Sequence, residues 1–239
     1  MNAKERVYLA VNGKIPDRVP SVPKIWVDLS AKLTGTDLLA VISDPMQALR
    51  AIAQAGRLCR VDGVRLFHFP PRELRVDGDH VYEVDSAGEL LGEIDMQGGL
   101  QTRLRSRESY DFESPWFMAH HHFWTFEEPI IRDQADAARI HIPDKSYYEE
   151  LGWGERQTVV EAELGEEIAV LGNCSSATMA FLVSMRGMNQ AMMDLIEEPE
   201  LAHRIMEKGV AIAVEKARFN LDRGVEVLRL NDSVGNMSV

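Results

Sequence analysis

The sequence has few cysteines, no long apolar run and an excess of acidic over basic residues. Cys59 and Cys174 are its only cysteines, and two cysteines so far apart in 239 residues do not make a disulfide framework. No apolar run reaches the roughly 18 residues that a membrane span needs, and no signal-peptide core follows the N-terminus. We therefore expect a protein of the reducing cytoplasm that makes no membrane contact.

The charge balance narrows the classes of partner. Acidic residues outnumber basic ones by 38 to 26, which gives a formal net charge of −12 at pH 7. Binding to nucleic acid or to an anionic membrane surface needs clustered Lys and Arg, so this balance argues against both. Hydrophobic and charged fractions of 45% and 27% are ordinary, and they indicate a globular domain with a well-solvated surface.

Four short apolar stretches predict strands that alternate with helices. They cover residues 22–28, 64–70, 168–171 and 224–233. Such alternation indicates a parallel sheet covered by helices. Residues 71–106 differ, because turn residues separate alternating segments there, which predicts an inserted antiparallel hairpin region.

Capping signals place the helices. Asn2 with Glu5 predicts a capping box at the N-terminus, and Asp44 before Pro45 predicts a second helix start. Pro199 opens the longest helical stretch. The stripe that this helix is expected to bury consists of Met206, Val210, Ala213, Ala217 and Leu221.

These elements amount to half of a barrel. Four βα units are half of a (β/α)8 TIM barrel, so we expect a single partial α/β barrel domain over residues 1–239, truncated after about four units, with the insertion at 71–106. A half barrel leaves two open sheet edges, which buried parallel strands rarely tolerate. We expect either that the remaining units lie beyond residue 239 or that a second copy, as a homodimer, or a partner chain covers the edges.

Three stretches resemble the uroporphyrinogen decarboxylase superfamily. The most specific is the opening Lys4-Glu5-Arg6-Val7 with Pro16-Asp17-Arg18-Val19-Pro20. The second is Leu171-Gly172 ahead of a helix, with Glu198-Pro199-Glu200, and the third is Gly224-Val225-Glu226 in the last predicted strand. The resemblance implies a TIM barrel, of which this chain would be the N-terminal two thirds.

Within that superfamily the chain is closer to the corrinoid-dependent methyltransferases than to the decarboxylases. Decarboxylases carry an Arg-Gln-Ala-Gly-Arg stretch whose arginines hold substrate carboxylates, whereas the matching residues 26–31 here include no arginine. Gln54-Ala55-Gly56-Arg57 spells part of that motif inside a predicted helix, which we interpret as coincidence.

The methyltransferase branch implies zinc, a corrinoid and a corrinoid protein as partner. In that branch one His and two Cys hold the zinc, which activates a thiol toward the methyl group. The two cysteines of this chain do not have metal spacing, and the sequence has no Asp-x-His-x-x-Gly corrinoid signature. The ligands that the resemblance implies are therefore not present in this chain.

Polar residues near the carboxyl ends of the predicted strands are the candidate site residues, because barrel enzymes do their chemistry there. Asp232 is the candidate catalytic residue, with capping of the next turn as the alternative. For Cys174 we expect either a lowered thiol pKa near a helix N-terminus or an inert buried thiol. The candidates for binding a small-molecule substrate are Trp26, Asp28, His68, Asn173, Cys174 and Asn231.

The run His120-His121-His122 is a candidate metal site. Neutral imidazoles bind zinc, nickel or copper. Neighbours in a strand point to opposite sides, so only His120 and His122 are expected to share a face. Binding would need at least one further ligand, and an ordinary aromatic-rich loop is the alternative.

The leading hypothesis is a uroporphyrinogen-decarboxylase-like methyltransferase that moves a methyl group between a cobamide and a small acceptor, such as a thiol or tetrahydrofolate. A decarboxylase of the same family that acts on another small acid is the first alternative, because one barrel supports many chemistries. A half barrel that binds or assembles without catalysis is the second.

Overall fold

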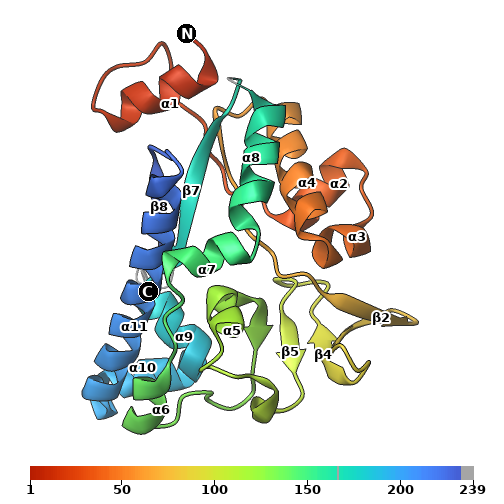
Figure 1. Cartoon of the computed structure of the whole chain (residues 1–239), viewed down its shortest axis with the longest axis vertical. Coiled ribbons are helices and arrows are strands. Elements are labelled where there is room, and N and C mark those ends of the chain that lie inside the picture. Colours follow the sequence, from red (N-terminus) through yellow and green to blue (C-terminus); the bar gives the residue numbers. More distant parts are fainter. Residues whose placement is uncertain (166, 233–239) are drawn as a thin grey trace. The chain divides into compact units, whose positions relative to one another are not determined.

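The computed structural model describes residues 1–165 and 167–232 of the chain (Figure 1). These residues divide into two compact units. The first unit comprises Met1–Pro71, Tyr148–Asn173 and Ala217–Arg229, and the second comprises Arg72–Tyr147, Cys174–Lys216 and the residues from Leu230 on.

The first unit contains the parallel pairing. Strand β1 (Gly63–Arg65) pairs in parallel with β7 (Ala169–Ser176), with Arg65 opposite Leu171, and the sheet order is β1-β7-β8, where β8 is Leu228–Asn231. A hydrophobic cluster of Val7, Ala169, Leu171 and Val227 packs one helix against these strands. The helices of this unit are α1 (Ala3–Val11), α2 (Val27–Thr34), α3 (Leu38–Ser43), α4 (Pro45–Leu58) and α8 (Trp153–Leu164).

The second unit is built on a five-stranded sheet of order β2-β3-β4-β5-β6. Its first four strands pair antiparallel, as the pattern of residues 71–106 predicts, while β6 (Trp124–Thr125) lies outside that range and pairs parallel to β5. Gly78 adopts φ +59° in the turn between β2 and β3, a value that glycine adopts without strain. The first four strands are β2 (Glu73–Asp77), β3 (His80–Val84), β4 (Leu90–Ile94) and β5 (Thr102–Leu104).

Short helices complete the second unit. They include α5 (Pro115–Ala119), α6 (Gln134–Arg139), α9 (Met179–Arg186) and α10 (Met188–Glu197), with 3-10 turns at Arg107–Ser109 and His121–Phe123. Helix α7 (Lys145–Glu150), the long helix α11 (Pro199–Asp222), β7 and β8 contribute residues to both units. The described residues therefore form a mixed α/β fold with open sheets.

The predicted helix starts are confirmed. Asn2 accepts a hydrogen bond from the Glu5 N–H at 2.8 Å, and the Glu5 carboxylate accepts from the Asn2 N–H at 2.9 Å, which completes the capping box. Asp44 accepts from the N–H of Met46 at 2.8 Å, with Pro45 at the first helical position of α4. These caps satisfy N–H groups that have no partner inside their helices.

The predicted strand at 22–28 is wrong, which leaves three strands (β1, β7 and β8) in this sheet among the described residues instead of four. Trp26 is the N-cap of α2, and Asp28 lies in its first turn, so neither residue ends a strand. Pro20 precedes the segment and Pro23 lies within it, and both lack the N–H group that a strand ladder needs. From Val27 on, the buried positions Val27, Ser30 and Ala31 have helical spacing, and this pattern prevails.

Strand β7 is longer than predicted. The sequence places its end at Leu171, before Gly172, but the strand continues to Ser176. The Gly172 N–H donates to the Val227 carbonyl oxygen at 3.0 Å, and an added Cβ at Gly172 would lie 2.7 Å from Asn220 Oδ1. The glycine therefore permits close packing inside a strand and does not end it.

The buried face of α11 differs from the predicted stripe. Val210 and Leu221 are 42% and 55% exposed. The face that is buried combines apolar residues with three that a hydropathy pattern rejects, namely Gly209, Lys216 and Asn220. Because those residues break the apolar periodicity, the stripe that the sequence predicts is rotated about the helix axis away from the face that is actually buried.

Gly209 marks the closest approach of α11 to its neighbours in the second unit. An added Cβ would lie 2.3 Å from the Ala177 carbonyl oxygen and 2.7 Å from the Phe181 ring. We expect Gly209→Ala to destabilise the protein by about 2 kcal/mol, because overpacking outweighs the better helix propensity of alanine. Urea unfolding measures the change in the free energy of unfolding. Val210→Ala, at an exposed position of the same helix, is the matched control; equal stability of both variants would contradict this packing.

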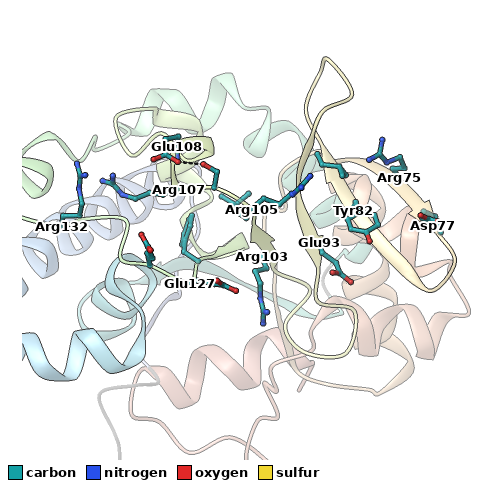
Figure 2. A pocket seen from close by; sticks show the side chains of 16 residues that line it. Arg75, Asp77, Tyr82, Glu93, Arg103, Arg105, Arg107, Glu108, Glu127 and Arg132 are labelled. Carbon is teal, nitrogen blue, oxygen red and sulfur yellow. Dashed lines mark hydrogen bonds between the residues drawn. The ribbon is translucent and has the colours of Figure 1, made fainter.

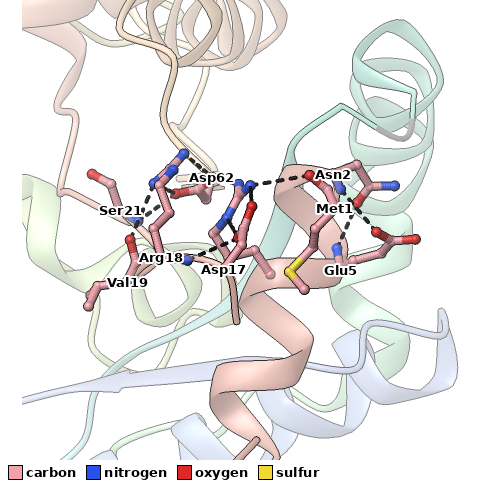
Figure 3. A network of polar contacts seen from close by, with 9 residues as sticks. Met1, Asn2, Glu5, Asp17, Arg18, Val19, Ser21 and Asp62 are labelled. Atoms are coloured by element: carbon pink, nitrogen blue, oxygen red, sulfur yellow. Dashed lines mark hydrogen bonds and ion pairs between the residues drawn. The ribbon is translucent and has the colours of Figure 1, made fainter. Parts of the chain in front are cut away.

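A buried carboxylate ties the N-terminal segment to β1 (Figure 3). Asp62 is 1% exposed and accepts from Arg6 Nη1 at 2.5 Å, Arg18 Nη1 at 2.7 Å and the Ser21 N–H at 2.7 Å. Arg6 also donates from Nε to Asp17 Oδ1 at 2.5 Å. The opening stretch that carries the family resemblance therefore has a structural role, since its two arginines neutralise the Asp62 carboxylate.

Candidate functional site

Three basic residues of the first unit form the candidate site, and we call them the basic cluster: Lys24, Arg65 and Arg229. Arg65 is the last residue of β1 and Arg229 is the second residue of β8, so two strands of one sheet supply guanidinium groups. Lys24 comes from the extended segment before α2. Arg65 is only 6% exposed, and its Nε is buried without a hydrogen-bond partner among the described residues.

The charges of the basic cluster act on one another. Burial, and then repulsion from Arg229, lowers the pKa of Arg65 to about 10. Burial followed by repulsion from Arg65 and Arg229 lowers the pKa of Lys24, while Asp28 opposes that shift. Burial also lowers the pKa of Arg229. Positive charge is thus concentrated locally in a chain that is acidic overall.

Aromatic rings lie beside these charges. Trp26 packs edge-on against Phe67 with ring centroids 4.7 Å apart, and it contacts Phe69 at 5.2 Å. Lys24 Nζ lies 5.0 Å from the Trp26 ring, and Arg65 Cζ lies 5.9 Å from the Phe67 ring. Rings of this kind reduce the local dielectric and strengthen the interaction of a cation with a bound anion.

The basic cluster has the chemistry of an anion site. A guanidinium donates paired N–H groups to a carboxylate or phosphate, and such charge-assisted bonds are roughly twice as strong as neutral ones. A buried N–H without a partner calls for one. An anion would satisfy Arg65 Nε and relieve the repulsion that lowers the pKa values of Lys24 and Arg65.

The predicted substrate-binding residues of the first unit have different surroundings. Trp26 and Asp28 lie near the basic cluster through the contacts above. His68 is buried and stacks on Trp153, with centroids 4.4 Å apart and planes 7° apart, and it meets Phe219 edge-on. Asn173 is half-buried on β7, and its Oδ1 has no hydrogen-bond partner in the part of the chain that the structure describes.

Cys174 does not have the lowered pKa that a helix N-terminus would give it. The thiol is 2% exposed and lies within β7. Burial raises its pKa, and the nearby charge of Lys216 offsets only part of the rise. The alternative interpretation, an inert buried thiol, is the one that this environment favours.

Asp232, the predicted catalytic residue, caps a helix. Its Oδ2 accepts from the Thr178 N–H at 2.8 Å and from the Thr178 hydroxyl, and its Oδ1 accepts from the Ala180 N–H at 2.7 Å. Both carboxylate oxygens are therefore engaged at the start of α9, and a catalytic role stays a prediction. The side chain of Asn231 lies outside the part that the structure describes.

The histidine run lies in the second unit, at the end of α5 and in the following 3-10 turn. His120 donates from Nδ1 to the Trp116 carbonyl oxygen at 2.9 Å. Burial holds the pKa values of His121 and His122 well below the ordinary value, with further lowering by Lys216. No group of three His, Cys, Asp or Glu side chains that could hold a metal occurs within residues 1–165 and 167–232. Metal binding by His120 and His122 stays a prediction.

A large groove lies on the solvent face of the antiparallel sheet (Figure 2). It encloses about 1090 Å³, and the register places Arg75, Tyr82, Glu93 and Arg103 in one row across four strands. Arginines and carboxylates both line it, and these four side chains are exposed or half-buried. Charges of both signs in contact with water bind ions weakly, so the groove is a poorer candidate than the basic cluster.

The sequence interpretation missed the basic cluster. Arg65 stands between Val64 and Leu66, and Arg229 between Leu228 and Leu230. A charged residue flanked by apolar residues within a predicted strand is the signal that would have found both. Lys24 has no such signal.

A protein-family model matches part of the chain. The family model described as uroporphyrinogen decarboxylase (URO-D) matches residues 118–238, about half of the chain. No curated protein matches the chain at a significant level. Among the described residues, no helix combines the length and the apolar character needed to cross a membrane.

Proposed function

The chain belongs to the uroporphyrinogen decarboxylase family, and on that premise we propose that it binds a small substrate that carries an acid group and takes part in moving a methyl group between a cobamide and that substrate. The observation that carries the proposal is the basic cluster, in which Arg65 is buried and its Nε has no hydrogen-bond partner among the described residues. A substrate anion is the natural partner for such a group.

Each residue of the cluster has a distinct part in holding the substrate. Arg65 donates to the acid group and fixes its orientation, since a planar guanidinium has directional donors. Arg229 adds a second guanidinium, and Lys24 adds charge without the same directional constraint. Trp26 and Phe67 cover the acid group with apolar surface, which excludes water and strengthens the ion pairing.

The departure from the decarboxylase motif supports methyl transfer. Residues 26–31, where decarboxylases hold substrate carboxylates with arginines, form the start of α2 and include no arginine. The partial motif at residues 54–57 lies inside α4, and Arg57 donates to the Glu163 carbonyl oxygen at 2.6 Å. That guanidinium is engaged in a structural contact, which supports the interpretation as coincidence.

The described residues do not fit zinc, because no three of their His, Cys, Asp or Glu side chains form a metal-binding group. A cobamide, when bound, supplies or takes up the methyl group. The residues of this chain hold and orient the small acceptor.

Decarboxylation of a small acid is the second candidate function. The fit of guanidinium groups to carboxylates favours it, because the same basic cluster would hold a polycarboxylic acid. In that reaction the bond to one carboxyl carbon breaks, CO₂ leaves and a proton takes its place. The two candidates share the site and differ in the chemistry.

A pair of thiols tests the proposal. The protein, expressed from its complete reading frame, is mixed with methylcobalamin and either 3-mercaptopropionate or the uncharged 2-mercaptoethanol, and demethylation is followed by visible absorption. We expect the acid-bearing thiol to react at lower concentration, with a preference of about tenfold that Arg65→Met removes. Release of CO₂ from di- and tricarboxylic acids without methyl transfer would favour decarboxylation. If neither reaction occurs and no acid binds, a non-catalytic assembly role replaces both.

A further inference from the structure

Lys216 is a buried amine in the second unit that the proposed function does not use. It is 1% exposed on α11, and Nζ donates to the Ala119 carbonyl oxygen at 2.9 Å and to Ser175 Oγ at 2.8 Å. Burial lowers its pKa to about 7. A large fraction of the side chain is therefore an uncharged amine at neutral pH, with a lone pair that can accept a proton.

Ser175 is held in an unusual backbone conformation. It is the penultimate residue of β7, at the carboxyl end of a parallel strand, and its φ of +66° lies in the left-handed region. A non-glycine residue in this region is strained, and such strain persists where the surroundings hold the residue in place. The strained backbone and the hydrogen bond to Lys216 together fix the position of the hydroxyl.

We propose that Ser175 and Lys216 form a nucleophile and base pair that gives this protein an acyl-transfer activity toward small esters. The geometry is that of an activated nucleophile: a hydroxyl within hydrogen-bond reach of a base, which a third group orients. The third group is the Ala119 carbonyl oxygen, to which Lys216 Nζ also donates. The inference is independent of the basic cluster and of methyl transfer.

The steps balance without an oxidant, a reductant or a metal. In the uncharged form of Lys216 the Ser175 hydroxyl donates to the Nζ lone pair across the same 2.8 Å contact. As Ser175 Oγ attacks the ester carbonyl carbon, that proton moves to Nζ. The C–O bond to the alcohol then breaks, and Nζ returns the proton to the leaving alkoxide. Water attacks the acyl-serine, with Lys216 as base again, and releases the acid and free Ser175.

The ionisable side chains near Lys216 do not change their charge near neutral pH. Burial holds the pKa values of His121 and His122 well below the ordinary value, so both rings are uncharged at neutral pH. Burial raises the pKa of the Cys174 thiol, which keeps it protonated. Among Lys216, His121, His122 and Cys174, a change of charge near neutrality therefore falls on the amine.

A fluorophosphonate probe tests the pair in the intact protein. The serine oxygen displaces fluoride from phosphorus, and mass spectrometry of peptides identifies the labelled residue. We expect Ser175 to be labelled, Ser175→Ala to abolish labelling, and Lys216→Met to slow it about 100-fold. Ser176→Ala is the matched control, since the neighbouring serine is half-buried and has no hydrogen bond to Lys216 among those described; it should react like the wild type.

The pH profile keeps the test decisive if Lys216→Met fails to fold. In the wild type, the labelling rate should rise between pH 6 and pH 8 as Lys216 loses its proton. Absence of labelling in protein with a native circular dichroism spectrum would overturn the proposal. So would labelling that survives Ser175→Ala, or a rate that does not change across this pH range.

Discussion

Replacing Asp62 by alanine is expected to destabilise the protein by about 4 kcal/mol, the typical result of breaking a buried ion pair. The Asp62 carboxylate is 1% exposed and accepts bonds from Arg6, Arg18 and the Ser21 N–H. Arg6 is itself only 7% exposed. Without the Asp62 carboxylate, its buried guanidinium loses one of the two negative charges that compensate it. The substitution also removes the acceptor of the Ser21 N–H, while the Ser21 carbonyl oxygen still accepts from the Asp62 N–H at 2.8 Å. Chemical denaturation measures the change.

An exposed ion pair provides the control for Asp62. Arg50 Nη2 lies 2.6 Å from Glu163 Oε1, but both side chains are about half exposed. We expect Glu163→Ala to cost less than about 0.5 kcal/mol, because solvent screens such pairs. Equal losses for the two variants would show that burial of the Asp62 carboxylate has no special effect.

The same network makes the fold sensitive to acid. Burial alone would raise the pKa of Asp62, but hydrogen bonds from Ser21, Arg18 and Arg6 hold it below its ordinary value, and a hydrogen bond from Arg6 lowers the pKa of Asp17 to about 2. A lowered carboxylate pKa stabilises the fold above the unfolded pKa near 4, and this contribution is lost as the pH falls toward the folded value. In Asp62→Ala the loss of stability between about pH 4 and pH 2 should be smaller than in the wild type.

Replacing Arg65 by methionine is expected to stabilise the ligand-free protein while it removes anion binding. Exchange of a buried, incompletely compensated charge for an apolar side chain of similar length typically gains about 2 kcal/mol, which raises the melting temperature by about 5 °C in a chain of this size. The repulsion between Arg65 and Arg229 disappears as well. Differential scanning fluorimetry with and without phosphate follows both effects.

The effect of phosphate on the melting temperature distinguishes an Arg65 that binds an anion from one whose buried charge only destabilises the protein. Phosphate should raise the melting temperature of the wild type and leave that of Arg65→Met unchanged, because a ligand stabilises only the state that binds it. Arg75→Met is the matched control, since Arg75 is an exposed arginine on the antiparallel sheet. A variant less stable than the wild type, with an intact phosphate effect, would contradict this role.

The sequence predicted the local structure wherever a cap or a turn residue acts alone. The helix starts at Asn2 and Asp44 and the turn at Gly78 depend on interactions within a few residues, and each is confirmed. The strand predicted at 22–28 failed because alternation over so few residues does not distinguish an extended segment from a strand with a partner. A partner strand is a tertiary property that this segment lacks among the described residues.

The sites were harder to predict than the fold, because which polar side chains become buried together depends on tertiary packing. Lys216 lies outside the stripe that the sequence predicts as buried, since a lysine rarely occupies a buried face. Arg65 and Arg229 come together only when β1 and β8 join one sheet through β7. For Cys174 the sequence leaves two alternatives open, and the structure favours the inert buried thiol, because the residue lies within a strand and burial raises its pKa.

Calorimetric titration of succinate into the protein tests the central claim, that the basic cluster binds the acid group of a substrate. We predict saturable binding by the wild type and by Arg75→Met, binding about 50-fold weaker by Arg65→Met as expected for the loss of a charge-assisted bidentate contact, and loss of affinity as salt is added. Equal affinity of the wild type and Arg65→Met, or no binding by the wild type at low ionic strength, would contradict the account.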